Sequence, residues 1–155
     1  MFRIIKNSIL VFISIIIFCC CSSKTADKDI IDYKANMLEA DRAFSKLSEQ
    51  KGIKLALLEY IDSNGVLLRP NSHPIVGGEA INFISQGSDT SYILTWEPKG
   101  GSVAKSGDLG YTFGVYSRQQ KNNSDVIYGT YVSVWKLQPD GKWKFALESG
   151  NEGIE

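Results

Sequence analysis

Apolar and polar residues follow a helical spacing in the first half of the chain and a strand-like spacing in the second half. Between residues 31 and 49, apolar side chains recur every three or four positions and the opposite face is charged, which predicts an amphipathic helix. Two shorter helices are predicted over residues 53–61 and 79–85. Between them, residues 63–65 have a turn composition, and residues 66–69 are predicted to form a short strand.

Beyond residue 91 the chain becomes rich in β-branched and aromatic residues. Four such runs cover residues 92–106, 109–121, 126–138 and 142–149. Short segments of Gly, Asn, Asp and Pro separate the runs, so successive runs should pair as an antiparallel meander. Gly110, Gly114 and Gly129 lie inside runs, where glycine marks bends, and they predict strong curvature. We therefore predict an α+β fold, a curved antiparallel sheet wrapped round three N-terminal helices.

The first 21 residues have the layout of an export signal. Arg3 and Lys6 precede an apolar run over residues 9–18, which is shorter than the roughly 20 residues of a membrane-spanning helix. The run ends at three adjacent cysteines followed by small polar residues, an arrangement that resembles the signal of bacterial lipoproteins. In that class a cysteine becomes the lipid-modified first residue of the mature chain. The predicted lipidation site is Cys21, with Cys20 as the alternative.

This resemblance implies an exported protein that is lipid-anchored to a bilayer of the bacterial cell envelope, in either the inner or the outer membrane. Residues 1–21 are then the signal peptide, residues 22–30 a polar tether, and residues 31–155 a single domain. An uncleaved short anchor is the alternative interpretation of the same segment.

Composition excludes several classes of site from the mature chain. All three cysteines lie in the signal segment, and His73 is the only histidine, so neither a cysteine site nor a multi-histidine metal site is expected. Without Arg3 and Lys6, 15 basic residues remain against 17 acidic ones. No basic patch is present, so we expect no nucleic-acid partner. We also expect no bound metal or cofactor.

Seven short phrases, in order, resemble one branch of the nuclear transport factor 2-like, or ketosteroid isomerase-like, superfamily. They are ADRAF (40–44), LLRP (67–70), GGEAI (77–81), LTWEP (94–98), SGDLGYT (106–112), YVSVW (131–135) and DGKWK (140–144). The resemblance is to the SnoaL-like branch, whose members are mostly of unknown function. It implies a cystatin-like cone with an apolar pocket at its open end, and frequent homodimers across the outer face of the sheet. It carries over no active site, because the aspartate base and the two oxyanion donors of the isomerases have no matching positions here.

Asp41 and His73 are the candidate acid–base residues. Asp41 lies at the edge of the apolar face of the first helix, where a carboxylate must find a partner, such as Arg69, or have its pKa raised. The alternative for Asp41 is a pocket base. His73 lies in a proline-flanked loop. The residues expected to line the pocket are Asp41, Arg69, Trp96, Tyr111, Tyr131 and Trp135. In the last run, alternation places Leu147 in the core and Glu148 in solvent.

Two functions fit these features. The first is a non-catalytic domain at the envelope that binds a small apolar or amphipathic molecule or another protein. The second is an isomerase, cyclase or dehydratase that uses Asp41 or His73 as general base. A homodimer is also predicted, because the 126–138 run is apolar on both faces, including Val132 and Val134 on the face opposite Tyr131.

Overall fold

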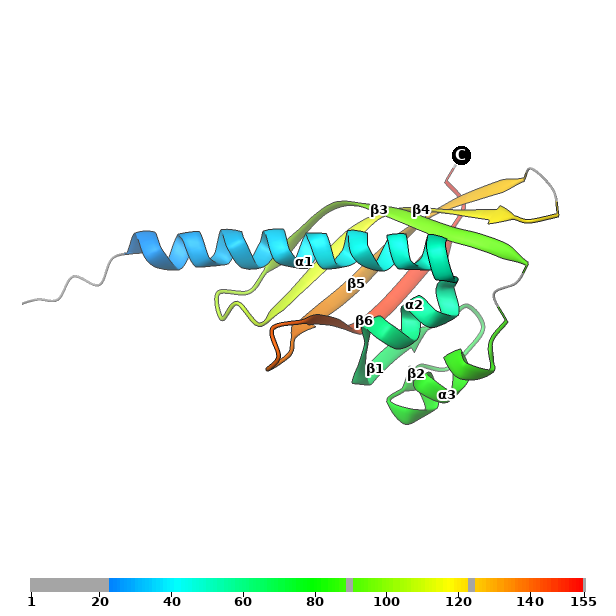
Figure 1. The fold of residues 1–155 in the computed structure, drawn as a ribbon, viewed down its shortest axis with the longest axis horizontal. Coiled ribbons are helices and arrows are strands. Elements are labelled where there is room, and N and C mark those ends of the chain that lie inside the picture. Colours follow the sequence, from blue (N-terminus) through cyan, green and yellow to red (C-terminus); the bar gives the residue numbers. More distant parts are fainter. Residues whose placement is uncertain (1–22, 89–90, 123–124, 155) are drawn as a thin grey trace, which may run out of the picture.

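A computed structural model describes residues 23–88, 91–122 and 125–154 of the chain. Its elements are α1 (Ser23–Lys51), α2 (Ile53–Tyr60), β1 (Ile61–Leu68), β2 (Ile75–Val76), α3 (Gly78–Gln86), β3 (Tyr92–Val103), β4 (Leu109–Gln120), β5 (Val126–Leu137) and β6 (Trp143–Glu152). Figure 1 shows α1 lying across one face of the curved sheet, with α2 and α3 below it at one end. The predicted α+β arrangement of helices against a curved sheet is confirmed.

The sheet has the strand order β2-β1-β6-β5-β4-β3. Strands β3 to β6 form the predicted antiparallel meander. Strand β1 instead pairs with β6 in parallel, a pairing that is not predicted from the sequence. A parallel pair needs a long crossover connection, and here α3 and three strands of the meander lie between the two partners in the chain.

The turn predicted at residues 63–65 is wrong, because these residues lie inside β1. Their pairing with β6 is irregular, with a register shift between Ile61 and Val66. The backbone N–H of Asn64 donates to the carboxylate of Asp62 at 2.8 Å, which satisfies a group that the irregularity leaves out of the ladder. The turn composition therefore bends the strand without ending it.

Helix α1 begins at Ser23, and the predicted start was residue 31. The segment interpreted as a tether is continuous with the helix, since residues 23–51 contain neither Gly nor Pro to stop it. Figure 1 shows the first turns of α1 extending beyond the sheet, and residues 31–36 are exposed. The predicted signal peptide, with Cys20 and Cys21, lies outside the described residues.

No helix within the described part of the chain is long and apolar enough to cross a membrane.

Polar side chains at helical spacing join α1 to the edge strand β3. The Ser45 hydroxyl donates to the carbonyl of Trp96 at 2.7 Å and accepts from its backbone N–H at 2.8 Å. One helical turn further on, Ser48 donates to the carbonyl of Leu94 at 2.7 Å. Because β3 is at the end of the sheet, these backbone groups have no strand partner, and the serines satisfy them.

The core is an aromatic cluster between α1, α2 and the inner face of the sheet. The ring of Phe44 lies 4.9 Å from that of Tyr60, 4.5 Å from Trp96 and 5.6 Å from Phe145, measured between centroids. Trp135 is fully buried beside them, and its indole N–H donates to the hydroxyl of Thr112 at 2.8 Å. This contact satisfies the one polar group that Trp135 brings into the core.

The outer face of the sheet is apolar across β4 and β5. Phe113 and Val132 are register partners on this face, and Tyr111 pairs with Val134 two residues along. Tyr111 and Phe113 are 46% and 47% exposed. The apolar character predicted for both faces of β5 is therefore present, and it leaves a contiguous exposed patch of the kind that mediates association.

Candidate functional site

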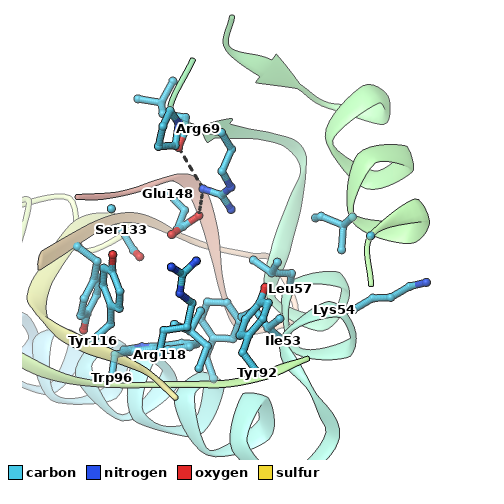
Figure 2. A pocket seen from close by; sticks show the side chains of 18 of the residues that line it. Ile53, Lys54, Leu57, Arg69, Tyr92, Trp96, Tyr116, Arg118, Ser133 and Glu148 are labelled. Atoms are coloured by element: carbon cyan, nitrogen blue, oxygen red, sulfur yellow. Dashed lines mark hydrogen bonds and ion pairs between the residues drawn. The ribbon is translucent and has the colours of Figure 1, made fainter. Parts of the chain in front are cut away.

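A cavity of about 490 Å³ lies between the inner face of the sheet and helices α2 and α3 (Figure 2). Its apolar lining consists of Phe44, Ile53, Leu57, Leu68, Phe83, Ile84, Tyr92, Leu94, Trp96, Tyr116 and Tyr131. The absence of a side chain at Gly129 leaves room for the ring of Tyr116 in the cavity lining, since a β-carbon at Gly129 would collide with that ring. The volume and the lining fall within the range of sites for small organic molecules.

Two ion pairs form the polar wall of the cavity. Nη1 of Arg69 lies 2.5 Å from Oε2 of Glu148, and Nη2 of Arg118 lies 2.9 Å from Oε1 of Glu152. Lys54 and Ser133 also line the cavity, and the ammonium group of Lys54 points away from it. Figure 2 shows the Arg69–Glu148 pair across the cavity from Tyr92 and Trp96. Polar groups at one end and aromatic rings at the other make the cavity amphipathic.

A bulge in β6 brings Glu148 into the cavity. Trp135 pairs with Phe145 and Val134 pairs with Leu147, so Ala146 has no partner in β5. One extra residue reverses which face the following side chains occupy. The predictions that Leu147 faces the core and Glu148 faces solvent are therefore wrong.

Asp41 is fully buried behind the cavity wall, and its carboxylate accepts two hydrogen bonds from that wall. The indole N–H of Trp96 donates to Oδ1 and the hydroxyl of Tyr131 donates to Oδ2, both at 2.7 Å. Arg69, the partner suggested from the sequence, is paired with Glu148 instead. The Asp41 carboxylate is thus held by two side chains of the sheet.

Burial raises the pKa of the Asp41 carboxyl group, against the opposing effects of hydrogen bonds from Tyr131, Thr112 and Trp96 and of the charge on Arg42. Burial also raises the pKa of the Tyr131 hydroxyl, and the negative charge of Asp41 adds to the increase. Tyr131 consequently keeps its proton and serves as a hydrogen-bond donor.

The other site residues predicted from the sequence lie in different parts of the structure. Arg69, Trp96 and Tyr131 line the cavity as predicted. Trp135 belongs to the core, and Tyr111 lies on the outer face of the sheet, so the structure does not bring either one into the cavity. His73 is exposed in the loop between β1 and β2 and does not reach the cavity.

Arg118, Glu148 and Glu152 line the cavity but are not among the residues predicted from the sequence. A signal for Arg118 was present, because alternation in β4 puts it on the same face as Thr112 and Tyr116. The positions of Glu148 and Glu152 depend on the bulge, which has no distinct composition. Within the described residues, no group of three or more His, Cys, Asp or Glu side chains is placed to hold a metal ion.

Solved structures with the same architecture include a ketosteroid isomerase-like protein from Erwinia carotovora atroseptica. It aligns with a TM-score of 0.59 and 16% identity over 77% of this chain and 95% of its own. An NTF2-like protein with a cystatin-like fold from Novosphingobium aromaticivorans aligns with a TM-score of 0.66 and 12% identity, over 86% and 90% of the two chains. This chain has the NTF2-like, cystatin-like fold.

A hexachlorocyclohexane dehydrochlorinase shares the NTF2-like fold as well, with a TM-score of 0.59 and 13% identity over 83% of this chain and 90% of that one. No protein-family model matches the sequence, and no curated protein matches it. The similarity therefore lies in the three-dimensional arrangement, which confirms the fold that the seven sequence phrases implied.

Proposed function

We propose that this NTF2-like domain binds a small, largely apolar molecule in the cavity and holds it without chemical conversion. The observation that carries the proposal is the cavity itself, with aromatic and aliphatic side chains on most of its wall and a few polar groups at one end. Such a wall favours an apolar body by removing its surface from water, while the polar end fixes its orientation.

The arrangement of acid–base groups favours binding over catalysis. Both oxygens of Asp41 already accept hydrogen bonds from Trp96 and Tyr131, and these two side chains separate Asp41 from the cavity. His73 lies outside the cavity. A general base must reach the proton that it removes, so neither residue supports the isomerase, cyclase or dehydratase alternative.

The names of the structural relatives are consistent with apolar ligands. One is a dehydrochlorinase of hexachlorocyclohexane, an apolar ring compound, and others are ketosteroid isomerase-like. We propose that this chain uses the same fold to hold a molecule of comparable character.

We further propose that the domain works at the cell envelope, anchored by a lipid on Cys21. The support is the layout of residues 1–21, together with the length of α1. Its first turns extend beyond the sheet and would hold the cavity away from the bilayer (Figure 1).

Titration of the domain with 1-pyrenebutanol, a neutral fluorescent probe with a flat apolar ring system, tests the binding proposal. Two neighbouring residues of β3 provide matched variants, because Leu94 lines the cavity while Ile93 is exposed and does not line it. Leu94→Trp should fill part of the cavity and weaken binding at least tenfold, whereas Ile93→Trp should bind like the wild type. Equal binding by both variants, or no binding by the wild type, would refute the proposal.

A further inference from the structure

The guanidinium group of Arg118 is only partly satisfied within the cavity, where Oε2 of Glu148 also has no hydrogen-bond partner among the described residues. Nη2 of Arg118 contacts Glu152 at 2.9 Å, and its Cζ lies 5.9 Å from the centre of the Tyr92 ring. Its Nε is buried and, among the described residues, has no hydrogen-bond partner. Figure 2 shows the side chain rising between Tyr116 and Tyr92 toward Glu148. A buried donor without an acceptor is rare in folded proteins and requires an explanation.

The two arginines of the cavity differ in how firmly they are paired. Arg69 and Glu148 are both mostly buried, with side chains 26% and 20% exposed. The partner of Arg118 is Glu152, whose side chain is 54% exposed near the end of β6 and, within the described residues, forms an ion pair through one nitrogen of the guanidinium group. An arginine offers five donors in a planar fork that matches a carboxylate in two parallel hydrogen bonds. Glu152 leaves most of that capacity unused.

The surroundings of Arg118 suit an amphipathic molecule. Two guanidinium groups, those of Arg69 and Arg118, and two carboxylates, those of Glu148 and Glu152, line the polar end of the cavity, while the ammonium group of Lys54 points away from it (Figure 2). Aromatic rings flank Arg118 on both sides, so a bound molecule could place an apolar body against the rings and its charged end on the guanidinium group.

We propose that the ligand of the cavity is an amphipathic carboxylic acid, whose carboxylate binds Arg118 in two parallel hydrogen bonds and displaces Glu152. The apolar body lies against Tyr92, Trp96 and Tyr116. Glu152 can swing into solvent because its side chain is half exposed and pairs with one nitrogen of the guanidinium group. This inference rests on the proposed function, since it specifies the polar end of the same ligand.

Comparison of 1-pyrenebutyrate with 1-pyrenebutanol tests this inference, because the two fluorescent probes share one apolar body and differ in the carboxylate. The wild type should bind the butyrate about tenfold or more tightly, the expected value of charge-assisted hydrogen bonds. Arg118→Gln should abolish that preference and leave the Kd of the butanol within about twofold. Arg42→Gln is the matched control, since Arg42 pairs with Glu39 and Glu97 outside the cavity, and it should keep the preference.

A second variant changes affinity in the opposite direction. Glu152→Gln removes the competing carboxylate from an exposed position and should tighten butyrate binding several-fold, while butanol binding stays unchanged. It also keeps the inference testable if Arg118→Gln does not fold.

The outcomes separate this inference from the proposed function. Equal binding of the two probes to the wild type would overturn the carboxylate inference and leave the apolar binding function standing. A loss of both probes in Arg118→Gln would also overturn it, because Arg118 would then only shape the cavity. If neither probe binds the wild type, both proposals are wrong.

Discussion

Removing the Asp41 carboxylate should destabilise the fold by about 3 kcal/mol. Asp41→Ala leaves the indole N–H of Trp96 and the hydroxyl of Tyr131 buried without an acceptor. Each such orphaned donor costs about 1–3 kcal/mol. Burial of the carboxylate, which raises its pKa, offsets part of this loss. In a domain of this size, about 3 kcal/mol corresponds to a fall in Tm of about 10 °C.

The pH dependence gives a second signature of the same group. The folded-state pKa of Asp41 is raised above its ordinary value of 3.8, so between these two values the folded chain holds a proton that the unfolded chain has released. The associated stability is fully present below pH 3.8 and is lost as the pH rises through the folded pKa. Asp41→Asn cannot titrate, and the wild type should therefore lose stability relative to this variant over that pH window.

Chemical denaturation followed by tryptophan fluorescence, at a series of pH values, measures both effects on the wild type and the variants. Asp32→Ala is the control, because Asp32 is an exposed aspartate on the same helix and its loss should change stability by less than about 0.5 kcal/mol. A change in Asp41→Ala as small as that of the control would refute the structural role of Asp41. A pH-independent difference between the wild type and Asp41→Asn would show that the pKa of Asp41 is not raised.

Three further predictions concern the serine contacts, the anchor and self-association. Ser45→Ala should destabilise by about 1–3 kcal/mol in thermal unfolding, since it leaves two backbone groups of β3 unpaired, whereas the exposed Ser85→Ala should not. Cys21→Ser should abolish incorporation of labelled fatty acid, and loss of label only in Cys20→Ser would identify the other cysteine as the site. Light scattering should show a dimer of the soluble domain at tens of micromolar that Val132→Lys dissociates and Ser85→Lys does not; a wild-type monomer would contradict the predicted interface.

The sequence predicted those parts of the fold that depend on local composition. The β-hairpins follow from turn residues such as Pro139-Asp140-Gly141, because these residues adopt tight turns wherever they occur. The position of Asp41 on the inner side of α1 follows from helical spacing alone. Its partners do not, since Trp96 and Tyr131 meet it only through the packing of α1 against two distant strands.

The errors at the site have a common physical origin in strand register. Residues 63–65 have a turn composition and yet continue β1, because pairing with β6 outweighs their local preference. Unbroken alternation along the last strand predicts that Glu148 faces solvent, and the unpaired Ala146 reverses this prediction. Tyr111 was assigned to the cavity, but its aromatic character does not reveal which face of β4 it occupies. Register is a property of the assembled sheet, and a single chain segment contains little information about it.

The bulge at Ala146 divides β6 into a first stretch that packs in the core and a second stretch that lines the cavity. Before it, Trp143 is committed to the core, and any change there must be compensated by repacking. After it, Glu148 and Glu152 line the cavity, so substitutions there change the polar groups that a bound molecule meets. Deletion of the unpaired Ala146 would leave a regular ladder in which Leu147 and Glu148 keep their present faces, because Phe145 and Leu147 already pair with adjacent residues of β5. One strand thus has a half that packs in the core and a half that faces the cavity, and the bulge separates the two.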